Sequence, residues 1–412
     1  MLRQKILKTE LENGITVVTD YMPGTYSANV GVWIPRGSRH EKRETNGLAH
    51  FYEHLVFKGT EKRSAFEIAH TIEDRGGNLE AYTTRQETGF YAQVVREDVA
   101  LALDVISDML MHPRFDSREM EKERKVIIEE VHSYDDIAEE CVGDLFNEIH
   151  YNGSGLALPI AGTVKTVRGL SREDLVECER EVLEDLPLTV CAVGKLEHEK
   201  IVDLVRKNFS DKKSGKKSRS NSYLANATRK TKSKKDLSQS NLFWGTSFDF
   251  RNGDIDFLRA LGLFNVAFGA DMGSRLFQKV REERGLAYSV YSMTDVYKDV
   301  LGWGVSLATA PHKMDEALEI AQAEFRNFLE DGFAKGELER TKMNIVGGLR
   351  IGADSAEKRL MRLADQMLHL GRVYTMAETE SHVKAFSEER LMELLREAFK
   401  NAPFATAVVK PA

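Results

Sequence analysis

Two stretches of this sequence, 102–131 and 317–349, are weakly similar to one another and run in the same order. ALDVISDMLMHPRFDSREMEKERKVIIEEV can be laid over ALEIAQAEFRNFLEDGFAKGELERTKMNIVGGL, and the second half of this match needs no gap. EDRGG at 73–77 falls near EERGL at 282–286 in the same order. Collinear self-similarity indicates duplication, so we expect two related α+β domains. The gap-free pairs are Phe115 with Phe333, Glu119 with Glu337, and Val131 with Leu349.

The chain length agrees with two domains, because 412 residues exceed what one hydrophobic core usually organises. A basic stretch, DKKSGKKSRSNSYLANATRKTKSKK at 211–235, contains ten Lys or Arg residues and almost nothing apolar. It is typical of a solvated linker, although a basic docking strip for an acidic or nucleic-acid partner also fits. We therefore predict an N-terminal domain at 1–210, a linker at 211–236 and a C-terminal domain at 237–412.

Turn and periodicity signals place strands and helices along the first domain. Asn13-Gly14 predicts a hairpin, and Asp116 with Glu119 predicts a capping box that opens a long helix at about 117–133. The other expected elements are a buried strand at 28–34, a helix at 64–77, a hairpin at 80–95 and an amphipathic helix at 97–112.

Composition narrows the class of protein. No run of about 18 apolar residues predicts a membrane span, and the first residues lack the apolar core of a secretion signal. The net charge of −7 argues against a nucleic-acid partner. Cys141, Cys178 and Cys191 are few and lack metal-binding spacing, which is typical of reduced thiols in the cytoplasm. We expect a cytoplasmic protein without a membrane partner.

The stretch GLAHFYEHLVFKGT at 47–60 places two histidines four residues apart. On a helix, His50, Glu53 and His54 project from one side, so the imidazoles can bind one Zn²⁺. Glu53 can then take a proton from a metal-bound water. A pair of histidines held only by structural hydrogen bonds fits the same pattern.

A third ligand is expected from the helix that contains EKERKVIIEEV at 121–131. Its carboxylates Glu123 and Glu130 are seven residues apart and lie together at the edge of the apolar side, whereas Glu129 points to solvent. A cation would relieve their repulsion, but an acidic ridge on a charged helix explains the pattern equally well. In the second copy Gly348 occupies the place of Glu130.

The chain resembles the M16 metallopeptidases, the pitrilysin-like enzymes whose signature is the inverted motif His-x-x-Glu-His. The resemblance covers almost the whole chain and includes GVWIPRGSRHE, NGLAHFYEHLVFKGT and SRLFQKVREERGLAYSVYS. It implies two homologous domains of the LuxS/MPP-like metallohydrolase fold, each a mostly antiparallel sheet packed with helices. It also implies one Zn²⁺ per chain, held by His50, His54 and Glu130, with 75 residues between the last two.

The resemblance assigns further roles. Glu53 matches the general base, and Glu123 matches a glutamate that orients a zinc-binding histidine. Arg281 and Tyr288 match a pair that faces the zinc across a chamber and stabilises the oxyanion. Glu80 stands where the family usually has a substrate-binding Asn before Ala81, and this departure puts the substrate preference in doubt.

We therefore expect a zinc-dependent endopeptidase that cleaves peptides or short unfolded segments inside a dimeric chamber. Large family members carry four such domains in one chain, and this chain has two, which implies a homodimer. Arg281 and Tyr288 would then act on the partner's zinc site. The alternatives are a non-catalytic scaffold or binding subunit and a protease dedicated to one precursor peptide. The segment FGADMGSRLF at 268–277 lacks a long glycine-rich loop, which argues against the non-catalytic subunit of a processing peptidase.

Overall fold

The structure is a computed structural model that describes residues 4–213, 215, 225–235 and 237–412. Over these residues the chain forms two compact units, and each unit takes segments from both halves of the sequence. Unit 1 comprises residues 1–132, 158–221 and 351–375, and unit 2 comprises residues 133–157, 222–350 and 376–412.

Unit 1 is built on a six-stranded sheet in the order β1-β2-β6-β3-β5-β4. The β2–β6 pair is parallel and the other pairs are antiparallel, so β4 lies at one edge of the sheet with β5 as its neighbour. The predicted hairpin turn is present, with Gly14 at φ 79° between β1 and β2. The strands are β1 (Lys5–Glu10), β2 (Ile15–Tyr21), β3 (Ser27–Ile34), β4 (Asn78–Thr83), β5 (Thr88–Val95) and β6 (Leu188–Gly194).

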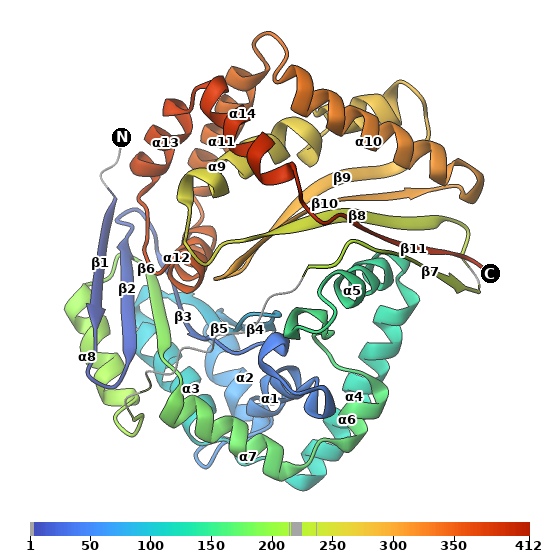
Figure 1. Ribbon diagram of the computed structural model, residues 1–412. Coiled ribbons are helices and arrows are strands. Elements are labelled where there is room, and N and C mark those ends of the chain that lie inside the picture. Colours follow the sequence, from blue (N-terminus) through green and yellow to red (C-terminus); the bar gives the residue numbers. More distant parts are fainter. Residues whose placement is uncertain (1–3, 214, 216–224, 236) are drawn as a thin grey trace. The chain divides into compact units, whose positions relative to one another are not determined.

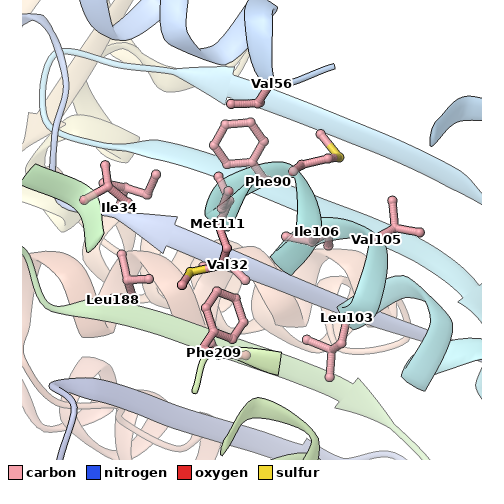
Figure 2. Packing of buried hydrophobic residues seen from close by; sticks show 14 of the residues in the cluster. Val32, Ile34, Val56, Phe90, Leu103, Val105, Ile106, Met111, Leu188 and Phe209 are labelled. Atoms are coloured by element: carbon pink, nitrogen blue, oxygen red, sulfur yellow. The ribbon is translucent and has the colours of Figure 1, made fainter. Parts of the chain in front are cut away.

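Helices cover both faces of this sheet (Figure 1). Side chains alternate between the two faces along each strand. Val32 and Phe90 point to the same face, where they pack on Ile106 and its neighbours in α3 (Figure 2). The helices of unit 1 are α1 (Leu48–Val56), α2 (Ala65–Glu73), α3 (Val99–Met111), the part of α4 (Ser117–Asp136) through His132, α6 (Val164–Gly169), α7 (Arg172–Arg180), α8 (His198–Asn208) and α12 (Ala356–Leu370).

Helix α12 comes from the C-terminal half of the sequence and covers the opposite face of the unit 1 sheet. Its Leu360 and Leu363 pack in one apolar cluster with Trp33 of β3. The Arg359 guanidinium is paired with the carboxylate of Asp20, whose side chain is fully buried. Because a buried charge left alone is costly, this pair ties α12 to strand β2.

Unit 2 contains a five-stranded sheet in the order β7-β11-β8-β10-β9. Helix α5 packs on one face through Phe146, whereas Trp303 of β10 joins Phe264 and Phe325 on the other face. The strands and helices are β7 (Arg229–Lys234), β8 (Ser240–Asp249), β9 (Ala287–Val296), β10 (Val300–Thr309), β11 (Ala405–Pro411), α5 (Ala138–His150), α9 (Ile255–Asn265), α10 (Met314–Asp331), α11 (Glu337–Gly352), α13 (Met376–Ala385) and α14 (Glu388–Phe399).

The two sheets share one topology. In each, a parallel pair (β2–β6 or β7–β11) is followed by three antiparallel pairs, and β1 is the additional strand of unit 1. The helices α3 and α4 that follow β5 correspond in order to α10 and α11 after β10. The expected fold, two homologous units each with a mostly antiparallel sheet and packed helices, is thereby confirmed.

The predicted linker at 211–236 falls partly on residues 214, 216–224 and 236, which lie outside the described part of the chain. Within its described part, Arg229–Lys234 is not a plain linker, because it forms strand β7 and pairs in parallel with β11. Five of the six β7 side chains are exposed, so the sequence shows only solvated charge while the backbone completes the sheet.

The predicted start of the long helix is also present. Asp116 accepts hydrogen bonds from the backbone N–H groups of Arg118 and Glu119, at 2.9 Å and 3.2 Å, and α4 continues to Asp136. Glu129 is exposed and Glu123 is buried, as the helical wheel predicts.

Candidate metal centre

Helix α1 is anchored by a carboxylate from outside the helix. Gly47 precedes it with φ 98° and brings no capping side chain, and a Cβ there would lie 2.7 Å from the carbonyl oxygen of Ala161. The Glu41 carboxylate takes the place of a cap by accepting from the N–H groups of Gly47 and Ala49 at 2.7 Å and 2.6 Å. Burial raises the pKa of Glu41 to about 7. The first turn of the helix that carries both histidines is thus fixed in place.

His50, His54 and Glu130 converge, with one ligand atom from each lying within 4.8 Å of the others. Glu130 Oε2 lies 3.7 Å from His50 Nε2 and 3.6 Å from His54 Nε2. Zinc bonds of about 2.0–2.2 Å at tetrahedral angles place ligand atoms about 3.4 Å apart. The three side chains therefore have the donor types of a zinc site, and both distances to Glu130 are close to the spacing of zinc ligands.

Glu123 approaches His54 from the side opposite this convergence. Its Oε2 lies 3.1 Å from His54 Nδ1, and its Oε1 lies 2.8 Å from Lys58 Nζ. The carboxylate therefore favours the proton on Nδ1, which leaves the Nε2 lone pair of His54 directed toward Glu130.

Glu53 is held in position by strand β4. Thr83 Oγ1 donates a 2.5 Å hydrogen bond to Glu53 Oε2. Burial raises the pKa of the Glu53 carboxyl, while the bond from Thr83 opposes that shift. A half-buried carboxylate with a raised pKa, beside a candidate metal site, has the properties of a general base.

His50 is the more deeply buried of the two histidines. Burial lowers its pKa to about 4, and the neighbouring His54 adds to that effect. An imidazole that stays neutral keeps the lone pair that a metal ion requires.

Glu80 and Ala81 occupy successive positions on the edge strand β4 and therefore point to opposite faces. Ala81 packs against the main core of unit 1, on the face that also presents Thr83 to Glu53. Glu80 is exposed, and its carboxylate accepts hydrogen bonds from Asn78 Nδ2 at 2.6 Å and from the Tyr91 hydroxyl. The Glu80 side chain thus lies on the sheet face away from Glu53.

Arg281 and Tyr288 lie together in unit 2. The Arg281 guanidinium sits 4.9 Å from the centre of the Tyr288 ring and 4.8 Å from that of Phe277. Tyr288 is 75% exposed, which is unusual for a large aromatic residue within a strand. Arg281 lies on the π-helical turn Phe277–Glu282 that leads to β9.

Comparison with known proteins identifies the family. Residues 16–164 match the family described as Insulinase (Peptidase family M16), and residues 169–345 match the Peptidase M16 inactive domain. The chain is 33% identical over 402 residues to the Bacillus subtilis protein named "Uncharacterized zinc protease YmxG", covering 97% of each chain. The chain belongs to peptidase family M16.

A further relative and a solved structure match nearly the whole chain. The beta subunit of the mitochondrial-processing peptidase from Neurospora crassa is 28% identical, with 98% of this chain and 88% of that protein covered. A Helicobacter pylori protease structure shares the fold with a TM-score of 0.91 at 18% identity, covering 99% and 100% of the two chains.

Within the described ranges of this M16 chain, no helix has the length and apolarity needed to cross a bilayer.

Three residues that support the site were not predicted from the sequence, namely Glu41, Lys58 and Thr83. Lys58 follows His54 at the next helical turn, so i, i+4, i+8 spacing could have indicated it. Thr83 is two residues after Ala81 and hence on the same strand face, which was a weaker signal. Glu41 left no signal, because it accepts from two backbone N–H groups and from the Asn46 side chain at a spacing that matches no helix or strand pattern.

Proposed function

We propose that this M16 protein is a zinc-dependent endopeptidase that hydrolyses peptides or short unfolded polypeptide segments. The observation that carries this proposal is the convergence of His50, His54 and Glu130 from two separate helices beside Glu53. The family and the relatives named zinc proteases support the same conclusion. In this proposal each chain binds one Zn²⁺ through these three side chains.

A zinc ion bound there would supply Lewis acidity, lowering the pKa of a coordinated water and polarising the scissile carbonyl. Glu53 removes a proton from the attacking water while Thr83 keeps its carboxylate in place. As the C–N bond breaks, Glu53 delivers that proton to the leaving amine nitrogen. Glu123 holds His54 in the tautomer that presents Nε2.

We further propose that the substrate lies along β4 as an added strand. Strand β4 is an edge strand, so its outer backbone groups can pair with an extended peptide. Ala81 would face the side of the peptide nearest Glu53, while Glu80 would place its carboxylate beside side chains on the other face. The Asn that the family usually has offers donors, so Glu80 would change the preference of this position.

The resemblance to M16 enzymes implies a homodimer in which Arg281 and Tyr288 act on the zinc site of the partner chain. The ordered cation–π pair and the exposure of Tyr288 are compatible with such a role. Mixing His50→Ala chains with Arg281→Ala chains tests it, since one intact composite site would form in the mixed dimer. If the mixture is no more active than either parent, the site is not shared.

The function is tested by zinc analysis and peptide digestion on the wild type and on Glu53→Gln. We expect both proteins to bind zinc and only the wild type to cleave, with exposed Glu44→Gln as a control that keeps full activity. Cleavage that survives Glu53→Gln would contradict the mechanism. Bound zinc without cleavage of any peptide would favour the scaffold role, and cleavage of one precursor alone would favour the dedicated protease.

Location in the cytoplasm is part of the same proposal. Cys141, Cys178 and Cys191 are all buried thiols, which suits a reducing compartment. Fractionation of the source cells would test it, and recovery outside the cytoplasm would contradict it.

A further inference from the structure

A lysine completes the chain of polar contacts behind His54. The side chain of Glu123 is only 9% exposed, and both of its oxygens are engaged, one by His54 Nδ1 at 3.1 Å and the other by Lys58 Nζ at 2.8 Å. The contacts therefore run in line from Lys58 through Glu123 to His54, on the side away from the convergence of His50, His54 and Glu130.

The local backbone places Lys58 where it can make this contact. Helix α1 ends at Val56, and the backbone N–H of Lys58 still donates to the carbonyl of Leu55 at 3.0 Å, which continues the turn. Lys58 follows His50 and His54 at i+8 and i+4, and the continued turn brings it to the side from which both histidines project. Glu123 meets this side from helix α4.

We propose that Lys58 is a positioning residue for the metal centre, holding the Glu123 carboxylate so that Glu123 in turn orients His54. The inference rests on the proposed zinc site and assigns Lys58 no contact with zinc or substrate. Lys58 differs in this from Glu123, which touches a ligand directly.

The charges of the site explain why such a cation is needed. Glu123 is buried, and a buried carboxylate that loses its charged partner is strongly destabilised where it lies. A Glu123 carboxylate that rotates toward solvent would no longer accept from His54 Nδ1. His54 could then shift its proton to Nε2, the atom that faces Glu130, where it would block metal binding.

The experiment uses the purified full-length protein with Lys58→Met, Lys58→Gln and Lys58→Arg, and with exposed Lys62→Met as a matched control. Zinc affinity is measured by competition with a chromophoric chelator. The His54 tautomer is read in the zinc-free protein from imidazole ¹⁵N shifts. Loss of a partner behind a ligand weakens metal binding about 10- to 100-fold, so one step further out we expect about fivefold to tenfold for Lys58→Met and Lys58→Gln.

Lys58→Arg should stay within about threefold of the wild type, because it keeps a cation beside the carboxylate. Lys62→Met should leave affinity and tautomer unchanged. In a Glu123→Gln background, Lys58→Met should add no further loss of affinity, since Lys58 acts through that carboxylate.

The outcomes separate this inference from the proposed function. If the wild type binds no zinc, the metal site itself is refuted, whatever Lys58 does. If the wild type binds zinc but Lys58→Met and Lys58→Gln match the Lys62→Met control in affinity and tautomer, the role of Lys58 is refuted. An equal loss in the Glu123→Gln background would also overturn it. A rise in KM with unchanged zinc affinity would instead assign Lys58 to the substrate.

Discussion

Helix α4 in unit 1 and helix α11 in unit 2 occupy corresponding places, each following the helix that comes after the β5 or β10 strand. Their interior positions differ. Glu123 and Glu130 of α4 correspond to Thr341 and Gly348 of α11, and the Thr341 hydroxyl donates to the carbonyl of Glu337 within its own helix. The α4 carboxylates thus contact histidines on another helix, whereas the Thr341 hydroxyl forms its hydrogen bond within α11.

The residues that flank the EDRGG and EERGL segments show the converse difference. In unit 1, Ile72 and Leu79 pack in the core, whereas Arg281 and Tyr288 stand at the matching positions of unit 2 and stack on each other. The fold has kept the same backbone positions twice while the chemistry of their side chains diverged. One unit thus carries a candidate metal site, and the other presents a cation beside an exposed phenol.

The largest expected effect comes from making α4 resemble α11 at its ligand position. Glu130→Gly should lower zinc affinity by more than about 100-fold, because it removes a ligand and not merely a partner of one. Glu129→Gly is the matched control: it has the same backbone cost on an exposed neighbour and should bind zinc normally. Chelator competition measures both, and equal affinities would remove Glu130 from the site.

Heptad spacing placed Glu123 and Glu130 at one edge of the apolar stripe, but an acidic ridge fitted the same pattern, and the resemblance to M16 enzymes was needed to single out Glu130. The packing of α5 on the unit 2 sheet and of α12 on the unit 1 sheet could not be predicted. An amphipathic helix shows that one of its faces is buried, but Leu360 and Leu363 do not indicate which sheet they bury against. Strand β7 could not be predicted for a related reason: its mostly exposed, charged side chains carry no apolar pattern, and only its backbone pairs with β11. Domain boundaries drawn along the sequence, at 210 and 237, remain a prediction.

A smaller effect is expected at the second position that separates the two helices. Glu123→Thr gives α4 the residue of α11 and leaves His54 Nδ1 without its carboxylate, so zinc affinity should fall about 10- to 100-fold. A control at the corresponding position of unit 2, Thr341→Ser, keeps the hydroxyl and should leave zinc affinity unchanged. The same chelator assay decides, and unchanged affinity in Glu123→Thr would show that His54 is oriented by other groups.

The hydroxyls at the matching strand positions provide a third test. Thr83 donates to the Glu53 carboxylate, whereas Ser292 in the corresponding place donates to the backbone carbonyl of Asn265. Thr83→Val should lower kcat about tenfold, because a poorly positioned Glu53 loses part of the rate contribution of a general base. Zinc content and KM should stay close to those of the wild type. Ser292→Ala should leave kcat unchanged. A fall in zinc content of Thr83→Val would indicate that Thr83 supports the metal rather than the base.

The last test concerns pH-dependent stability and a histidine of unit 2. His150 of unit 2 is fully buried. Its Nδ1 lies 3.0 Å from the Asn226 carbonyl and its Nε2 lies 2.6 Å from Ser247 Oγ. Both ring nitrogens are therefore engaged in hydrogen bonds within the protein, unlike those of the candidate metal site. Burial lowers the pKa of His150 to about 4, below its ordinary value of 6.5. The unfolded state therefore binds more protons between these values, and stability falls as the pH falls from 6.5 toward 4. The difference between the two pKa values corresponds to about 3 kcal/mol in the free energy of unfolding.

Thermal unfolding of the His150→Gln variant should lose that part of the pH dependence, whereas the exposed-site variant His312→Gln should retain it. Equal slopes in the two variants would show that His150 is already protonated in the folded protein.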